Sequence, residues 1–319
     1  MTLASFHDLG LPTESVAERN DSLQPVRVST IARWLPWVAR LAWVFVAVVG
    51  GRAIEAAVDG RSSAVRWVAG VGGWAAWGLV LGALLIASVR SLTIVRVGVP
   101  VSAAVAIAVV VAGVSPADLL SLVVPAAITL LVVFTAEFGR SFVQASAYGD
   151  EERFPLRPPA AVGVAAVVTW MLWAAAIVAG PLLLAAHSWI AGGLVTVVAV
   201  AGTVVLAPRW HRLSRRWLVL VPAGIVVHDP VVLADTMSLR TNQVRRMRLA
   251  PESTEAADLT GPASGYAVEI ETAETVTAVF AFTPQDPNGR AIHLTSFLVG
   301  PSRPGHALAA AARRGLPVG

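Results

Sequence analysis

The side chains that most often carry chemistry are scarce in this sequence and lie far apart. There is no cysteine and no lysine, which excludes thiolate nucleophiles, cysteine-ligated metals and lysine Schiff bases. The six histidines are widely separated, and no two stand at a metal-ligand spacing. No HExxH pattern and no paired acids occur within the apolar runs. The sequence therefore predicts a non-enzymatic protein with no catalytic residue, no cofactor and no metal.

The charged residues that do cluster are arginines. Four of them follow the last long apolar run, and we take these four as candidates for binding lipid head groups: Arg209, Arg212, Arg215 and Arg216. Basic residues just outside a membrane helix attract anionic lipids. The alternative is a topogenic signal that only keeps the end of the last helix on one side of the membrane.

A second polar group occupies residues 139–159, the longest connection between apolar runs. Exposed loops with aromatic and charged side chains often carry recognition. Together with two later arginines, this loop supplies the candidates for binding a partner protein: Arg140, Gln144, Tyr148, Asp150, Glu151, Arg153, Arg245 and Arg246. A solvated connector is the alternative. We also expect the loop acids, Asp150 to Glu152, to pair with Arg245, Arg246 and Arg248.

Long apolar runs must position these groups. Hydrophobic residues make up 56% of the chain and charged residues 14%, whereas soluble domains hold about 25% charged residues. A bilayer core takes roughly 20 apolar residues of helix. Runs of that length predict six transmembrane helices, at 35–56, 67–89, 97–114, 119–136, 160–185 and 188–207. Arg40 lies inside the first run, where Arg33, Trp34 and Trp37 indicate that its side chain reaches the interface.

The arginine distribution predicts the orientation. Arginines lie before the first run, between the second and third, between the fourth and fifth, and after the sixth, whereas the connections around Asp118 and His187 contain none. The first connection is the exception, with Arg52, Arg61 and Arg66. The positive-inside rule places both termini in the cytoplasm of a multi-pass cell-membrane protein.

The chain then divides into three parts: a disordered cytoplasmic tail at 1–33, a six-helix transmembrane domain at 34–208, and a cytoplasmic β-rich domain at 209–319. In the last part, 217–221 and 225–227 predict a β-hairpin, and 244–249 a strand. Residues 266–271 and 276–282 predict a second hairpin around Ala273 and Glu274. Residues 292–299 predict a further strand, and 305–314 a closing helix.

Several strands followed by one terminal helix, with a first hairpin reading WLVLVPAGIVVHDP, resemble the bacterial pleckstrin-homology-like (PH-like) domains that follow transmembrane helices. The polar stretch 251–265 has no counterpart in such a domain. As a whole, the chain resembles polytopic integral membrane proteins common in actinobacteria, a resemblance that implies no activity.

Two functions remain open. The first is a non-enzymatic scaffold or accessory protein that presents its cytoplasmic domain to a partner protein or to membrane lipids. The second is a transporter or channel for a neutral or apolar solute, favoured by prolines within spans and by tryptophans in spans two and five. A net charge of +4 without a long basic block argues against nucleic acid as a partner. Small-residue pairs at Gly78 with Gly82 and at Ala176 with Gly180 predict close helix packing within the chain.

Overall fold

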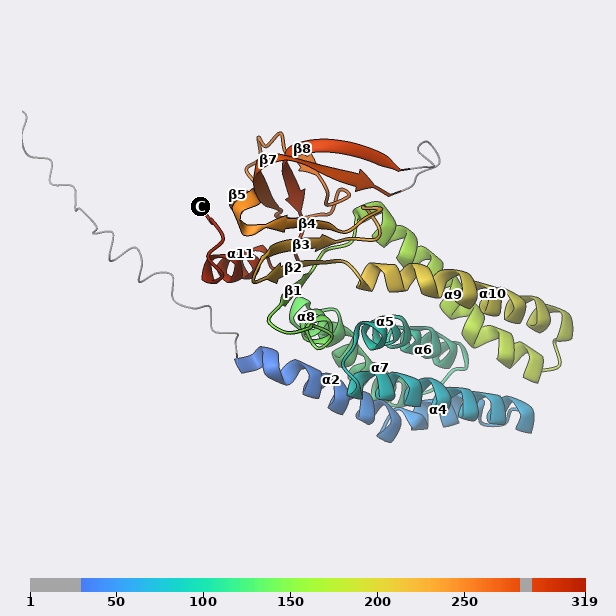
Figure 1. The fold of residues 1–319 in the computed structure, drawn as a ribbon. Coiled ribbons are helices and arrows are strands. Elements are labelled where there is room, and N and C mark those ends of the chain that lie inside the picture. The colour runs from blue at the N-terminus through green and yellow to red at the C-terminus, as the bar shows by residue number, and fades with distance from the viewer. Residues whose placement is uncertain (1–29, 282–288) are drawn as a thin grey trace, which may run out of the picture.

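The computed structural model describes residues 30–281 and 289–319, and it contains a helical bundle and a β-rich part (Figure 1). The predicted tail lies almost wholly outside the described residues. Within them, six helical segments are long and apolar enough to cross a membrane: Ala32–Val58, Ser63–Leu85, Val89–Val111, Pro116–Val133, Ala160–Ala185 and Trp189–Ser214. The prediction of six such helices is confirmed for this part of the chain.

Two of the six segments are each broken into two helices. The bundle helices are α2 Thr30–Val48, α3 Gly51–Val58, α4 Ser63–Leu85, α5 Val89–Gly98, α6 Val101–Val111, α7 Pro116–Val133, α9 Ala160–Ala185 and α10 Trp189–Ser214. Gly50 lies at the first break, where a Cβ atom would stand 2.5 Å from the Val46 carbonyl oxygen. The second break occurs at Pro100, because proline has no N–H with which to continue the helical hydrogen bonds.

One predicted boundary is wrong and another is confirmed. The third span begins at Val89 rather than at residue 97, so Arg90 and Arg96 lie in α5 and not in a connection. The fifth span is confirmed at 160–185, since α9 has these bounds and continues through Gly180 and Pro181. The turn comes later, at His187, which has a positive φ of 62°.

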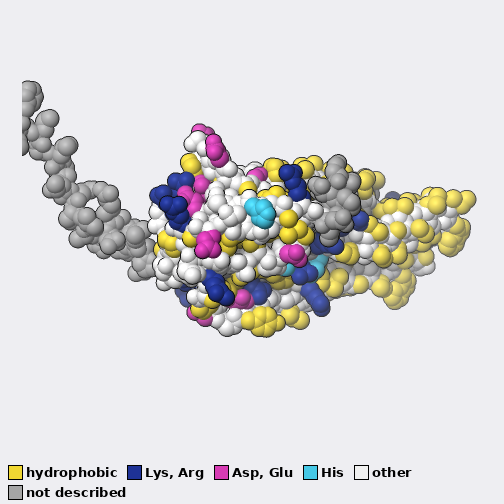
Figure 2. All heavy atoms as spheres, turned by 45° about the horizontal axis from the view of Figure 1, so that its top comes forward, with side chains coloured by type: hydrophobic (Ala, Val, Ile, Leu, Met, Phe, Trp, Pro, Cys, Tyr) yellow, Lys and Arg dark blue, Asp and Glu magenta, His cyan; other side chains and the backbone are white. Residues whose placement is uncertain are grey.

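Most of the large hydrophobic side chains that are exposed belong to the bundle helices. The end of the bundle that is visible beyond the β region is accordingly mostly apolar (Figure 2). The helices α9 and α10 pack closely: a Cβ atom on Gly180 would lie 2.7 Å from Thr196 Oγ1. The small-residue pair in α9 therefore packs within the chain, as predicted. For Gly78 and Gly82 the prediction is wrong, since no described atom lies within 4 Å of a Cβ at either position.

Indole N–H groups join the helices inside the bundle. Trp43 of α2 and Trp77 of α4 each donate to the other's backbone carbonyl, at 3.0 and 2.8 Å. Trp170 of α9 donates to the Val97 carbonyl at 3.0 Å, next to the break at Pro100 where helical hydrogen bonds are missing. Trp173 donates to Thr203 Oγ1 of α10 at 2.8 Å. In an apolar medium each such donor needs a partner, and here the partners are neighbouring helices.

Two arginines of the spans bind the carboxyl-terminal ends of neighbouring helices. Arg40 Nε donates to the Leu84 carbonyl at 3.0 Å, and its guanidinium lies 4.8 Å from the Trp37 ring centroid. Arg96 Nε donates to the Val133 carbonyl at 3.4 Å. Helix carboxyl ends carry unpaired carbonyls and partial negative charge, so cations are stabilised there.

We call the strands with the closing helix the β region. Its elements are β1 Glu152–Pro155, β2 Trp217–Val221, β3 Gly224–His228, β4 Met237–Arg240, β5 Val244–Leu249, β6 Ala257–Asp258, β7 Val268–Phe280, β8 Arg290–Val299 and α11 Pro304–Arg313. Among the described residues they form two four-stranded sheets, in the orders β1-β2-β3-β4 and β5-β7-β8-β6. All pairs are antiparallel except β6 with β8.

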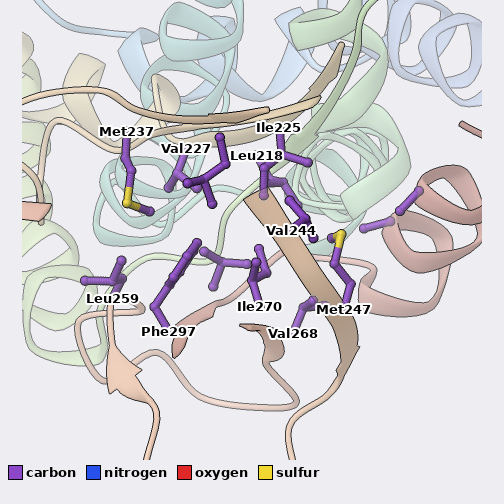
Figure 3. Packing of buried hydrophobic residues seen from close by; sticks show 14 of the residues in the cluster. Leu218, Ile225, Val227, Met237, Val244, Met247, Leu259, Val268, Ile270 and Phe297 are labelled. Atoms are coloured by element: carbon purple, nitrogen blue, oxygen red, sulfur yellow. The ribbon is translucent and has the colours of Figure 1, made fainter. Parts of the chain in front are cut away.

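The two sheets enclose one apolar core. Leu218, Ile225 and Val227 of the first sheet point toward Ile270 and Phe297 of the second (Figure 3). The closing helix α11 adds three buried alanines to this core. A shared core of this kind makes the two sheets one folding unit.

The predicted hairpin at 217–227, the strand at 244–249, the strand at 292–299 and the closing helix are all confirmed. The predicted second hairpin is wrong, because 268–280 forms the single strand β7. Its pairing with β8 shifts register between Glu271 and Val276, which is where the sequence indicated a turn. The residue Phe282 lies outside the described part. The strands β1, β4 and β6 were not predicted.

Candidate functional site

The candidate site lies where the β region meets one end of the bundle. The chain reaches it from α7 through the short helix α8, Ala136–Gln144. Thr135 caps the start of α8, since its Oγ1 accepts a hydrogen bond from the Phe138 N–H. Phe138, Phe142 and Val143 of α8 are buried against the bundle. The helix therefore follows the end of the fourth span and directs the chain toward the β region.

The loop after α8 becomes part of the first sheet. Its strand β1 pairs with β2, which follows the sixth span, and Phe154 lies opposite Leu218. The Arg157 N–H donates to the Gly300 carbonyl at 2.8 Å, and the Ser302 N–H to the Pro155 carbonyl at 2.8 Å. The β region is thus joined to the bundle both before α9 and after α10, and it does not begin only after the last span.

Gln144, a predicted partner-binding residue, holds this loop in place. Its Nε2 donates to the Glu151 carbonyl at 2.7 Å, and its Oε1 accepts from the Arg153 N–H at 2.9 Å. Both ends of the side-chain amide are used within the chain. Tyr148, in contrast, is 84% exposed and remains open to a partner.

The loop acids pair with arginines, but not with the predicted ones. Asp150 lies 2.7 Å from Arg314 of α11. Glu152 lies 3.2 Å from Arg140 and 3.5 Å from both Arg313 and Arg314. These pairs connect the loop, the end of the bundle and α11. Each exposed pair contributes about 0–1 kcal/mol, so their effect comes from acting together.

The expected pairing with the arginines of β5 is wrong. Arg248 pairs instead with Glu269 and Glu271 of the adjacent strand β7, at 3.3 and 3.2 Å. Arg246 Nε donates to the Gly319 carbonyl, where the carboxyl-terminal residues run beside β5. Arg245 is exposed. The arginines that pair with the loop acids are Arg313 and Arg314, at the end of α11. The sequence showed this pair in the last turn of the predicted helix, but nothing in it placed the pair near residue 150.

Arg216, a predicted lipid ligand, is buried in the β region. Its side chain and that of Asp229 are each 1% exposed, and they form two hydrogen bonds of 2.7 and 2.6 Å. Arg216 also donates to the carbonyls of Arg157 and Thr260. The prediction is wrong for this residue, because a head group cannot reach it. Its function is to tie β2 to three neighbouring segments.

The other three arginines of this group, Arg209, Arg212 and Arg215, are exposed. Arg215 lies at the rim of a cleft of about 290 Å³ on the outer face of the first sheet. The residues that line this basic cleft are Glu151, Arg153, Arg215, Trp217, Val219, Val221, Val226, His228 and Thr236. Of these, Arg215 was predicted to bind lipid head groups, and Glu151 and Arg153 were predicted to bind a partner protein.

Aromatic stacking shapes the basic cleft. The Trp217 ring stacks on His228 with centroids 5.0 Å apart, and the Arg153 guanidinium lies 5.2 Å from the Trp217 centroid. Arg153 also pairs with Glu151 at 2.6 Å. His228 Nδ1 hydrogen-bonds Thr236 Oγ1 at 2.9 Å, whereas its Nε2 is buried with no partner among the described residues.

Burial is the main cause that lowers the pKa of His228 below its usual value, and the positive charges of Arg215 and Arg153 lower it further. Asp229 acts in the opposite direction, without reversing the shift. The imidazole is therefore neutral at pH 7 while the cleft is empty of anions. The basic cleft combines guanidinium groups, one imidazole and an apolar floor.

No group of three metal-ligating side chains is placed to hold a metal ion in the part of the chain that the structure describes. Comparisons with protein-family models, with curated proteins and with solved structures find no match to this chain.

Proposed function

We propose that this chain is a non-enzymatic integral membrane scaffold or accessory protein, whose bundle holds the β region at the cytoplasmic face of the cell membrane for a partner protein or lipid head groups. The observation that carries this proposal is the insertion of β1 into the first sheet. Connections on both sides of the α9 and α10 pair enter the β region, which fixes its orientation relative to the bundle. A fixed orientation is what a presenting scaffold requires.

The proposed cytoplasmic location rests on the arginines. The connections around Asp118 and His187 contain none, whereas the ends of the bundle that face the β region carry many. Arg40 and Arg96 support the same assignment, since their side chains bind helix carbonyls at that end.

Two sheets around one core, with a helix after the last strand, support the resemblance of the β region to PH-like modules. Two features depart from a plain run of strands: β1 comes from between the spans, and the short β6 is parallel to β8. Stretch 251–265, which had no counterpart in the resemblance, contains β6.

Four members of the predicted partner surface are exposed: Tyr148, Asp150, Arg245 and Arg246. Asp150 pairs with Arg314 and Arg246 bonds the Gly319 carbonyl, which leaves Tyr148 and Arg245 for a partner among the described residues. We do not extend the proposal to transport, because Trp77 and Trp170, which motivated that alternative, are hydrogen-bonded to other helices.

Photo-crosslinking in native membranes tests the scaffold. A photoreactive residue is placed at Tyr148 or at Arg245, and a matched control at Asp118, on the opposite end of the bundle. We expect the same protein to be crosslinked from Tyr148 and Arg245 and not from Asp118. Recovery of no reproducible partner from either position would contradict the protein-partner part of the proposal.

The topology has its own test, helped by the absence of native cysteine. Tyr148→Cys and Arg246→Cys are expected to react with a membrane-impermeant thiol reagent only after the cells are opened. Labelling of either position in intact cells would overturn the cytoplasmic location. An Asp150→Cys and Arg314→Cys pair, whose native side chains are paired at 2.7 Å, is expected to be joined by a bifunctional thiol crosslinker.

A further inference from the structure

The basic cleft faces the bundle and not the bulk solvent. The first sheet lies between the second sheet and the bundle (Figure 1). Trp217, on the outer face of this sheet, packs against the apolar cluster of the bundle that contains Phe138 and Phe142. The cleft beside Trp217 is therefore situated at the level where the bundle helices leave the membrane.

The backbone of Arg215 lies just outside the head-group layer, within reach of its long side chain. The apolar part of α10 ends near Pro208, and from there to its C-cap Arg215 the helix rises about 10 Å. The polar layer on each side of a bilayer is about 5–8 Å thick. A long arginine side chain at that position reaches lipid phosphates, as snorkelling arginines do.

Positive charge from two helices gathers beside Arg215, at one side of the cleft. His211 of α10 hydrogen-bonds Thr93 of α5 at 2.8 Å, which brings the end of α10 against the start of α5. Arg90 does not line the cleft itself, but it lies in that first turn of α5, one turn before Thr93 and so toward the end of α10. The helix amino terminus adds a partial positive charge. Neither Arg90 nor Arg215 pairs with a carboxylate among the described residues.

The other side of the cleft is apolar. Val219, Val221 and Val226 line it beside the Trp217 ring. A free phosphate ion gains nothing from contact with such a surface. The glycerol and the first methylene groups of a lipid are stabilised there, because their apolar surface is removed from water. The buried and unpartnered Nε2 of His228 supplies a further hydrogen-bonding group for a phosphate oxygen.

We propose that the basic cleft binds the phosphate of an anionic phospholipid from the adjacent leaflet. Arg215 and Arg90 contact the phosphate oxygens, His228 Nε2 donates a hydrogen bond to them, and the glycerol lies against Val219 and Val226. This inference rests on the proposed function, because it requires the β region to lie against the membrane surface. It adds to that function a lipid that fills the space between the β region and the bundle.

The test uses the full chain in detergent micelles with defined lipid added, and native mass spectrometry counts the lipid that stays bound. Phosphatidylglycerol is compared with phosphatidylcholine, since both carry a phosphate and only the first has a net negative charge. The variants are Arg215→Gln and Arg90→Gln. The matched control is Arg209→Gln, because Arg209 is an exposed arginine of the same helix that lies outside the cleft.

We expect one phosphatidylglycerol to be retained in preference to phosphatidylcholine. Each cleft variant is expected to weaken its binding about fivefold, as the loss of one basic contact predicts. The control Arg209→Gln is expected to bind as the native chain does. An equal loss in all three variants would mean diffuse surface attraction and would overturn the proposal.

Inorganic phosphate provides the second arm. Displacement of the lipid by millimolar phosphate, with the same dependence on Arg215, would assign the cleft to a soluble anion and overturn the lipid assignment. A failure of the cleft proposal is distinguishable from a failure of the scaffold, since crosslinking from Tyr148 does not depend on bound lipid. Lipid binding without any crosslinked partner would contradict the protein-partner part of the scaffold alone.

Discussion

The bundle and the β region satisfy their buried polar groups with different side chains. In the bundle, indole N–H groups of Trp43, Trp77 and Trp170 donate to backbone carbonyls of other helices. In the β region, Arg216 and Asp229 form a fully buried ion pair. Both arrangements follow one rule, that a polar group away from water needs a partner. The bundle meets it with neutral indole donors, and with arginines only at helix ends. The β region uses a buried ion pair.

The difference has an energetic consequence. For Trp43 and Trp77, removal of the indole donor leaves only a carbonyl in the middle of a helix, which already has its helical partner. Removal of one member of a buried ion pair leaves an uncompensated charge. The β region is therefore expected to be far more sensitive to loss of one polar contact than the bundle.

The largest effect is expected for Arg216→Met. Asp229 then stays buried without its cation, which costs roughly 3–5 kcal/mol of β-region stability. Native-state proteolysis measures the opening of the β region directly. The control is Arg303→Met, which breaks the more exposed pair with Glu137 and is expected to cost at most about 1 kcal/mol. Equal proteolysis of the two variants would contradict the assignment of Arg216 as the central tie.

The arginine group 209–216 also marks the limit of sequence reasoning. The six spans were predictable because length and apolar content are local properties. The different positions of Arg215 and Arg216 were not, since α10 ends and β2 begins between these neighbours. One side chain lies at a cleft rim and the next enters the core. Only the tertiary arrangement separates them.

The strands differ in the same way. The hairpin at 217–228 has an alternating apolar pattern and a turn, which are local signals. The strand β1 is four residues long and includes charges, so the sequence indicated a connector. It forms a strand because it pairs with the edge of β2, which lies far along the chain. Strand formation depends on such pairing with distant residues more than on local sequence.

The close packing of α9 and α10 gives the next prediction. A Cβ atom on Gly192 would lie 2.6 Å from the Leu184 backbone nitrogen, so Gly192→Ala must push the helices apart. We expect a loss of about 1–3 kcal/mol. The matched control is Gly193→Ala, since no described atom lies within 4 Å of its Cβ. That variant is expected to be neutral or more stable, by up to about 1 kcal/mol of helix propensity. Thermal unfolding in detergent compares the two.

A smaller loss is expected for Trp43→Phe, which removes one of the two reciprocal indole hydrogen bonds. Such bonds within membranes contribute about 0.6 kcal/mol on average. The control is Trp67→Phe, because the Trp67 ring is 72% exposed on the bundle surface. Thermal unfolding of both variants measures the difference. A loss in Trp43→Phe as large as that in Arg216→Met would refute the contrast between the bundle and the β region.

The smallest effect concerns pH and His228. Burial, Arg215 and Arg153 hold its pKa in the folded chain below the usual value of about 6.5. The unfolded chain therefore binds more protons in this range, so stability is complete above pH 6.5 and falls as the pH drops toward the folded pKa. Native-state proteolysis of the β region is expected to quicken below pH 6.5, and His228→Gln to flatten this slope. Burial also lowers the pKa of His306, so this residue contributes to the same slope. His306→Gln is therefore the control that measures the part of the slope that does not come from His228. An unchanged slope in His228→Gln would show that this imidazole is not held neutral in the cleft.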